Sequence, residues 1–434
     1  MVPRELLRAS LLALLFLSVS APSLLGQEKP QGFSQEKLAQ IPELIKKSVE
    51  RKQIAGGSTL IARHGKIAHR ATVGHQDVEG KAPLTESTIF RLASMSKPVT
   101  CVAVMILVDD GKLSVTDPLS KFVPEFKDVQ VLVPADDGQS HELVKAKRAI
   151  TIHDLLTHTS GITYGLLNKP IVSKMYAEAG VSDGVVETPG TLGDNVRKLA
   201  KLPLCCQPGA AWEYGLNMDV LGYVVEVVSG KSLEQFCRER LFQPLQMKDT
   251  CLVLPKEKWP RLSALYWMGP DKTIQRVGDK PVTLGAFVFS ATFPMREDRG
   301  FYSGGGGMVS TIGDYFRFCQ MMLNKGGLDG VRVLKQETVE RMTQNQIGEL
   351  RIGFPGFDLM GYGVGVLSEK GKETSKEVLG VGSYSWAGGF GTFFWVDPRS
   401  DLIGIFMTQT SPPDFAMVGE FKRLTYEALA EAKK

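Results

Sequence analysis

The apolar residues of this chain are most concentrated in segment 94–108, where they cover nearly every side of the helix that the segment predicts. A helix without a polar face belongs in a protein core, and Gly111 is placed to end it. Segment 34–52 has the contrasting amphipathic pattern, with Ser34 as its cap and many Lys and Glu residues. We therefore expect one helix inside the molecule and the other on its surface.

Apolar runs predict strands near both ends of the chain. They form two expected hairpins, 56–63 with 66–73 and 392–396 with 402–408. Caps and apolar periodicity predict helices after Thr151 and Ser232, and over 217–228, 312–324 and 417–432. Strands near both termini with helices between them predict an α+β fold, with an antiparallel sheet built from both ends of the chain.

The same order of elements divides the chain into two expected subdomains. A sheet subdomain takes in about 27–92 and 330–434, and a mainly helical subdomain takes in about 93–329. Residues 127–148 are polar and irregular, which is typical of a surface excursion. No internal repeat or low-complexity linker separates the two parts, so we treat 27–434 as one domain.

Residues 1–26 have the pattern of a secretory leader. Arg4 and Arg8 precede the apolar run 11–17, and Gly26 supplies a small residue for cleavage. The run is too short and too broken for a membrane-spanning helix. We expect cleavage after Gly26 and a periplasmic or extracellular protein. An uncleaved anchor is the alternative, and only in that case do we expect contact with a membrane.

Composition and charge exclude few classes of protein. The 434 residues are 43% hydrophobic and 23% charged, as in an ordinary globular protein, and a net charge of +4 gives no reason to expect a nucleic-acid partner. The six cysteines contain no CxxC and are expected to be mostly buried thiols, with any disulfide unassigned. No HExxH occurs, so we expect no histidine-based metal site. The last histidine is His158, which argues against an α/β-hydrolase, whose catalytic histidine comes late.

The strongest chemical signal is the S-x-x-K motif of Ser94 and Lys97 at the start of the apolar helix. This spacing places both side chains on one face, one turn apart. The positive end of the helix dipole stabilises a serine alkoxide, and burial disfavours a charged lysine, so the lysine can take the serine proton. The motif also occurs at Ser34, where we interpret the serine as a helix cap on a solvated surface.

Several ordered motifs make the chain resemble the serine β-lactamase and penicillin-binding protein superfamily, and more narrowly its class C-like branch with the family VIII carboxylesterases. They are Ser94-x-x-Lys97 and the segments 151–161 (TIHDLLTHTSG), 212–216 (WEYGL), 219–222 (DVLG), 304–311 (GGGGMVST) and 382–389 (GSYSWAGG). Together they span about residues 35–430. The resemblance implies that the 151–161 run, including His158, is structural, and that the glycines at 304–307 form a tight loop on a cleft wall.

The resemblance also implies a role for individual residues. Ser94 would be the acylated nucleophile, Lys97 its partner, and Tyr214, which matches the tyrosine of the family's Y-x-N element, would share the work of general base. The backbone N–H groups of Ser94 and Gly389 would form the oxyanion hole. No metal or organic cofactor is implied.

Two departures from the family pattern bear on the substrate. Leu216 stands at the third position of Y-x-N, with Asn217 one place late. The K-T-G element is here Trp386-Ala387-Gly388, expected as an edge-strand segment lining the cleft, and it offers no cation for a substrate carboxylate. We expect Leu216 to line the substrate cleft as well. Both losses weaken the case for β-lactams and D-Ala-D-Ala peptides and fit the W-x-G of family VIII esterases.

The sequence thus predicts a secreted serine hydrolase that cleaves esters through a Ser94 acyl-enzyme, with a small ester or amide as substrate. One alternative is a D-alanyl-D-alanine carboxypeptidase or β-lactamase that uses the same site on a cell-wall peptide or β-lactam. The other is a non-catalytic cell-wall binder that keeps the cleft. The natural substrate and the oligomeric state stay open.

Overall fold

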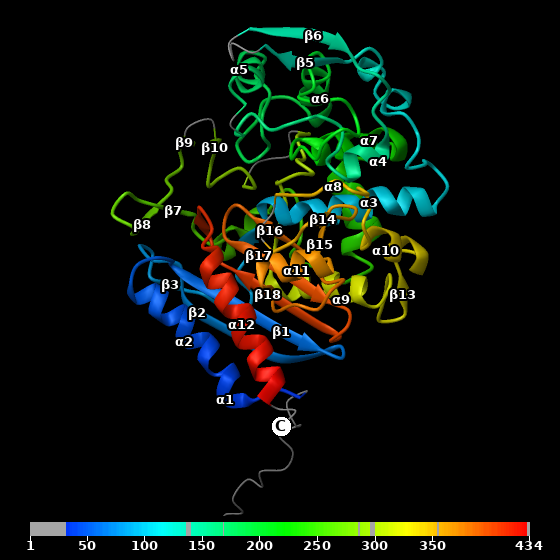
Figure 1. Cartoon of the computed structure of the whole chain (residues 1–434). Coiled ribbons are helices and arrows are strands. Elements are labelled where there is room, and N and C mark those ends of the chain that lie inside the picture. Colours follow the sequence, from blue (N-terminus) through cyan, green and yellow to red (C-terminus); the bar gives the residue numbers. More distant parts are fainter. Residues whose placement is uncertain are drawn as a thin grey trace, which may run out of the picture.

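The computed structural model describes residues 32–431 except 136–139, 168, 285–286, 296–299 and 354–355, so the expected leader 1–26 lies outside the described residues. An eight-stranded antiparallel sheet occupies the centre, in the order β14-β15-β16-β17-β18-β1-β2-β3 (Figure 1). Its strands are β1 (Gly56–Arg63), β2 (Lys66–Asp77), β3 (Ala82–Pro83), β14 (Leu359–Met360), β15 (Gly365–Val366), β16 (Tyr384–Gly388), β17 (Thr392–Asp397) and β18 (Leu402–Met407).

In the middle of the sheet, two strands from opposite ends of the chain lie side by side. β1 pairs antiparallel with β18, with Ser58 opposite Met407 and Arg63 opposite Leu402. The two predicted hairpins supply four adjacent strands, and the first turns at His64 and Gly65, both with positive φ, as a two-residue hairpin turn requires. The α+β prediction, with a sheet built from both termini, is confirmed.

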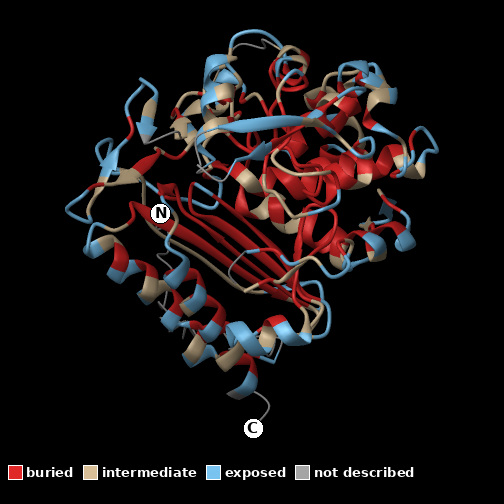
Figure 2. Cartoon of the chain, turned by 45° about the horizontal axis from the view of Figure 1, so that its top comes forward, coloured by how far each residue is buried: buried red, intermediate tan, exposed pale blue. Residues whose placement is uncertain are grey.

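Successive side chains of β17 point to opposite faces of the sheet, and a helical layer packs on each face. Trp395 contacts Phe421 of α12 (Phe415–Glu431), with ring centroids 5.2 Å apart. Its neighbour Phe394 points the other way and contacts Tyr315 of α9 (Ile312–Leu323) at 5.3 Å. α1 (Gln35–Leu38) and α2 (Gln40–Glu50) lie beside α12, with apolar sides inward and polar sides outward (Figure 2).

The helical part of the molecule lies on the side of the sheet near β16. It contains α3 (Ser96–Asp109), α4 (Ile152–Leu156), α5 (Pro170–Glu178), α6 (Leu192–Leu199), α7 (Asn217–Ser229) and α8 (Leu233–Cys237). α3 packs against α7 and α8 and is buried over its first three turns, as its uniformly apolar pattern predicts (Figure 2). None of the helices among the described residues is long and apolar enough to cross a membrane.

Several boundaries differ from the expectations. The segment 34–52 is two helices, because the chain breaks at Ala39. The excursion 127–148 contains a hairpin, β5 (Gln130–Pro134) with β6 (His141–Lys145). The second part of the sheet subdomain was expected to begin at about residue 330, but it begins earlier, because α9 already packs on the sheet. The helical part also carries short strands, β7 (Tyr266–Met268), β8 (Ile274–Arg276), β9 (Val282–Leu284) and β10 (Phe287–Phe289).

The remaining short elements connect these two parts. They are β4 (Phe90–Arg91), β11 (Val309–Ser310), β12 (Gly327–Leu328), β13 (Val331–Arg332), β19 (Thr410–Ser411), α10 (Gln336–Met342) and α11 (Glu369–Ser375). β4 pairs with β11, and β19 pairs in parallel with β7. β4 leads directly into the turn that carries Ser94, so the β4–β11 pair anchors that turn to the start of α9.

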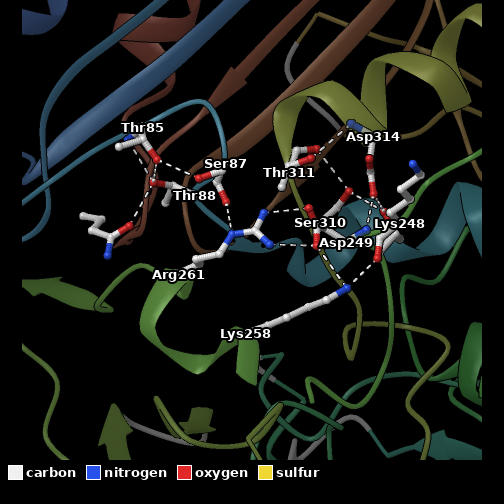
Figure 3. Close-up of polar contacts among 12 residues, drawn as sticks. Thr85, Ser87, Thr88, Lys248, Asp249, Lys258, Arg261, Ser310, Thr311 and Asp314 are labelled. Atoms are coloured by element: carbon white, nitrogen blue, oxygen red, sulfur yellow. Dashed lines mark hydrogen bonds and ion pairs between the residues drawn. The ribbon is translucent and has the colours of Figure 1, made fainter. Parts of the chain in front are cut away.

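A polar network braces the β4–β11 pair (Figure 3). Arg261 donates to both oxygens of Asp249 at 2.9 and 2.6 Å, and to the carbonyl of Ser87 at 2.9 Å. The Asp249 N–H and the Thr250 hydroxyl donate to Asp314 of α9 at 2.7 and 3.0 Å. The bidentate geometry and partial burial make this ion pair stronger than an ordinary surface pair.

We expect Arg261→Ala to lower the free energy of unfolding by about 1–3 kcal/mol, because it leaves the partly buried Asp249 without its bidentate partner. The matched control is Arg423→Ala, which removes ion pairs to Glu420 and Glu427 on the surface of α12. That change is expected to cost under about 1 kcal/mol. Urea denaturation of both variants measures the difference, and equal losses would contradict a bracing role for Arg261.

Candidate active site

Ser94 lies in a tight turn between β4 and α3. Residues Ala93–Met95 form a 3-10 turn, and α3 follows from Ser96. Ala93 has φ +46°, a conformation that residues other than glycine rarely adopt. Such strain persists only where the surroundings enforce it. The result is that Ser94 is partly exposed at the N-terminal end of a buried helix.

Lys97 is buried one turn further along, with 1% of its surface exposed. Its Nζ donates to Ser94 Oγ at 3.0 Å and to the carbonyl of Gly305 at 2.7 Å. Two aromatic rings also face this ammonium group, Tyr214 at 4.8 Å and Tyr164 at 5.3 Å from the ring centroids. The cation is therefore solvated by a carbonyl, a hydroxyl and π faces.

Tyr214 completes the constellation from the loop before α7. Its hydroxyl donates to Ser94 Oγ at 2.8 Å. The structure thus brings the three residues of the predicted catalytic group together, although they lie up to 120 positions apart in the chain. Two donors converge on one serine oxygen, an arrangement able to stabilise negative charge on that oxygen.

A buried carboxylate lies behind Lys97. Asp219 on α7 is 2% exposed and accepts a hydrogen bond from the Ser303 hydroxyl at 2.6 Å. Burial raises the pKa of Asp219 to about 6, against the opposing effects of the Ser303 bond and the Lys97 charge. Gly305 must be glycine here, because a Cβ would lie 2.4 Å from Asp219 Oδ2 and 3.0 Å from the Tyr164 hydroxyl.

His158 packs beneath this group and is not hydrogen-bonded to Ser94. Its ring centroid is 4.9 Å from that of Tyr214, and its Nδ1 is 2.9 Å from Asn217 Nδ2. Burial holds the pKa of His158 well below its usual value, and the Lys97 charge lowers it further. The ring is therefore neutral at pH 7 and serves as packing, in line with the structural interpretation of the 151–161 run.

The end of β16 lies against the Ser94 turn. A Cβ on Gly388 would come within 2.1 Å of the Leu92 carbonyl, which also accepts the Thr392 hydroxyl at 2.9 Å. Gly389, the next residue, is exposed, and a Cβ there would meet nothing within 4 Å. Ser94 and Gly389 both line the same cavity.

This cavity measures about 300 Å³ and is mostly apolar. Ser94, Tyr164 and Tyr214 lie along it, with Ala387 and Gly388 from β16. The remaining described lining residues are Ala93, Leu166, Asp183, Val185, Phe287, Gly305, Gly306, Gly389, Phe390, Ser411, Pro412, Pro413 and Phe415. A cavity of this volume and lining suits a small organic ligand.

The prediction that Leu216 and Trp386 line the cleft is wrong. Leu216 is 0% exposed because it caps α7 with its side chain turned into the core. Trp386 is 1% exposed and contacts the Tyr214 ring, with centroids 5.8 Å apart. Neighbouring residues on a strand face opposite sides, so Ala387 faces the cavity and Trp386 does not. Segment 386–388 pairs with β17 on one side, while β15 reaches only Ser385 and Tyr384 on the other, so the segment has the expected edge position in the described sheet.

The sequence analysis assigned no role to three residues of the site. Tyr164 and Asp183 follow no motif with a stated chemical role, and only the fold brings them to the cavity. Asp219 stands in the recognised segment 219–222, and this motif was the available signal in the sequence. The structure places Asp219, buried, in the first turn of α7. Asn217, one place late for Y-x-N, accepts a hydrogen bond from the Ser160 hydroxyl at 2.5 Å, and its Nδ2 lies 2.9 Å from His158 Nδ1.

Among the described residues, no group of three or more His, Cys, Asp and Glu side chains is arranged to hold a metal ion. All six cysteines are free thiols, and Cys205 and Cys206 are the two that are not fully buried. The site's charged and polar groups are therefore those of its serine, lysine, tyrosines and carboxylates.

Comparison with known proteins places this geometry in a family. The family described as Beta-lactamase matches residues 41–427. The chain belongs to the beta-lactamase family. It is 32% identical to esterase EstB of Burkholderia gladioli over 86% of this chain and 90% of that protein, and 33% identical to protein Rv1367c of Mycobacterium tuberculosis over 83% and 86%.

The fold of this beta-lactamase family member also matches solved structures. EstCE1, described as a hydrolase with promiscuous acyltransferase activity, superposes with a TM-score of 0.78 at 26% identity, covering 90% of this chain and 99% of that chain. The resemblance to the β-lactamase and penicillin-binding protein fold, with its esterase-like branch, is confirmed. The protein is a serine hydrolase-type enzyme with the fold shared by hydrolases and acyltransferases.

We expect Tyr214→Phe to lower kcat by about a hundredfold or more, because it removes the only hydroxyl that bonds Ser94 Oγ among the described residues while keeping the ring. The matched control is Tyr223→Phe on α7, whose hydroxyl bonds Arg197 away from the cavity. Its kcat should stay within about twofold. Steady-state kinetics with a chromogenic ester measure both, and equal effects would contradict a specific role for the Tyr214 hydroxyl.

Two neighbouring glycines give a second test. Gly388→Ala places a methyl group against the Leu92 carbonyl, so it should displace the end of β16 and lower kcat/KM by about a hundredfold. Gly389→Ala adds its methyl group in open space and keeps the N–H, so its activity should stay within about threefold. Similar losses in both variants would show that the two positions are not distinguished by this contact.

Proposed function

We propose that this enzyme hydrolyses carboxylic esters in two steps through an acyl-enzyme on Ser94. The observation that carries the proposal is the convergence of Lys97 Nζ and Tyr214 Oη on Ser94 Oγ, at 3.0 and 2.8 Å, beside an apolar cavity. Nucleophilic catalysis by serine needs a nearby proton acceptor and a group that orients it, and these two side chains can supply both.

In the first step, Ser94 Oγ attacks the ester carbonyl carbon and its proton passes to Tyr214 Oη, which accepts it in the ionised form of Tyr214, while Lys97 keeps its charge and stabilises the phenolate. The carbonyl oxygen takes the negative charge and is held by the N–H groups of Ser94 and Gly389. The C–O bond to the alcohol then breaks, and the alcohol leaves with the transferred proton. Each such N–H donor supplies about 3–4 kcal/mol of transition-state stabilisation in comparable sites.

In the second step, water attacks the acyl-enzyme and its proton passes to Tyr214, for which we propose the base role. The nearby Lys97 cation stabilises negative charge on the phenol oxygen. Ser94 recovers a proton as the acid leaves, so the site returns to its starting state. His158 takes no part in this proton transfer, because its ring is neutral and is not bonded to Ser94.

The cavity favours an ester over a substrate with a free carboxylate. The described residues that line it include no lysine or arginine, and the one charged side chain among them is the carboxylate of Asp183. A substrate carboxylate would therefore meet like charge and no cation. This supports an esterase over the alternative of a D-alanyl-D-alanine carboxypeptidase or β-lactamase, which act on such carboxylates.

The proposal includes export. It rests on the leader pattern of residues 1–26 in the sequence, and N-terminal sequencing of the protein secreted by an expression host tests it. A mature chain that starts near residue 27 is expected. A chain that retains residues 1–26 in the cytoplasm would overturn this part of the proposal.

The reaction is tested by labelling the purified protein with a fluorescent alkylphosphonate and mapping the modified residue by mass spectrometry. We expect label on Ser94, none in Ser94→Ala, and a strong reduction in Lys97→Ala, because that change removes a donor to Ser94 Oγ. Label in Ser34→Ala should equal that of the wild type, which separates the two S-x-x-K serines.

Turnover assays separate the competing functions. Short-chain p-nitrophenyl esters should be hydrolysed, and nitrocefin should be turned over much more slowly. Nitrocefin turnover that exceeds ester turnover would favour the β-lactamase alternative. A folded protein that takes no label and turns over neither substrate would favour the non-catalytic binder.

A further inference from the structure

The cavity beside Ser94 holds one carboxylate in an otherwise mostly apolar wall. Of the described residues that line it, Asp183 alone has a charged side chain. Val185, Phe287 and Phe390 line the same cavity. Ser94 and Tyr214 line it too, so a substrate of Ser94 that fills the cavity would meet the Asp183 residue in its wall.

The backbone on both sides of Asp183 is fixed in place. The Ser182 N–H donates to Asn195 Oδ1 at 2.9 Å, and Asn195 Nδ2 donates back to the Ser182 carbonyl at 3.0 Å. Gly184 has φ +89°, and a Cβ there would lie 2.3 Å from Ser303 Oγ. The carboxylate is therefore presented by a rigid segment, the condition for selective recognition of a ligand.

The carboxylate of Asp183 is only partly used within the protein. Oδ1 accepts the Gly165 N–H at 3.1 Å, and the Leu166 N–H also bonds the carboxylate. Burial raises the pKa of Asp183 to about 6, and the nearby Asp219 acts in the same direction. The Lys97 charge lowers this pKa, but among the described residues no lysine, arginine or histidine forms a direct ion pair with the carboxylate. A half-desolvated carboxylate without a directly paired cation is costly, and a positively charged ligand would offset that cost.

We propose that Asp183 selects esters that carry a positively charged nitrogen on the group filling this cavity. The proposal rests on ester hydrolysis at Ser94 and adds the class of substrate. Asp183 binds the cation directly, while the apolar wall takes the carbon chain around it. A cationic nitrogen with alkyl substituents suits both the carboxylate and the apolar wall, because the aromatic rings in that wall also attract a cation.

The test compares esters that differ in one atom. One pair is the p-nitrophenyl ester of trimethylammonio-butanoic acid and its analogue with carbon in place of nitrogen. The other pair is the butanoate ester of choline and its carbon analogue. The first pair places the charge on the acyl side and the second on the alcohol side. In one of the pairs the wild type should favour the cation by about tenfold in kcat/KM, through KM more than kcat.

Asp183→Asn should lower kcat/KM for the cationic ester by about tenfold and so abolish that preference. Asparagine keeps one acceptor oxygen for the Gly165 N–H, removes the charge and replaces the other oxygen with an amide NH2 group. The matched control is Glu187→Gln, which removes an exposed charge from the same loop outside the cavity wall. It should retain the full preference for the cation.

A further measurement on the wild type does not depend on how the variant folds. Butyltrimethylammonium should compete with the neutral ester at least about tenfold more strongly than the matched neutral alcohol does. Ester hydrolysis without a cation preference in either pair, or a preference unchanged in a folded Asp183→Asn, would overturn the role of Asp183 alone. Absence of all ester hydrolysis would overturn the proposed function, and the role of Asp183 with it.

Discussion

The buried ammonium group of Lys97 is the constraint around which the centre of this molecule is arranged. A cation placed in a core must be solvated by the protein itself. Here the solvating groups come from four segments far apart in the sequence: Ser94, the loops carrying Tyr164 and Tyr214, and the carbonyl of Gly305. The glycine-rich loop at 304–307 has little room for side chains, because it passes between α3 and the carboxylate of Asp219. Fixing one charge therefore fixes the positions of every polar group around the serine.

The sheet sets where this charge lies. β1 and β18 join the two ends of the chain, and β17 carries β16 alongside, so the glycines after Trp386 come to rest against the turn of Ser94. The β4–β11 pair and the network around Asp249 hold that turn from the other side. The site is thus assembled at the boundary between the sheet and the helical part. Its apolar cavity opens there, with Asp183 presented from a separate, tightly bonded loop.

Much of the fold could be predicted from the sequence because its signals are local. The uniformly apolar helix α3, the hairpin turns and the caps at Thr151 and Thr311 all depend on residues close in the chain. The capping box at Thr151 and Asp154 is complete, whereas at Ser232 the structure has the bond from the Gln235 N–H to the serine hydroxyl. The break at Ala39 was missed although its cause is local, because Pro42 has no N–H to donate to the carbonyl of Leu38. The early start of the sheet layer with α9 was missed because it depends on packing between distant segments.

The sequence by itself determined the chemical group at the centre. Spacing on one helix puts Ser94 and Lys97 together, and ordered motifs point to Tyr214 and to the glycines after Trp386. Only the tertiary structure decided which side chains face the cavity. Leu216 and Trp386 stand in recognisable motifs yet turn into the core, while Tyr164, Asp183 and Phe390 reach the cavity from segments without any such signal. The reason is physical: a motif fixes the path of the backbone, but the direction of a side chain depends on strand alternation and on neighbours that the chain brings up from far away.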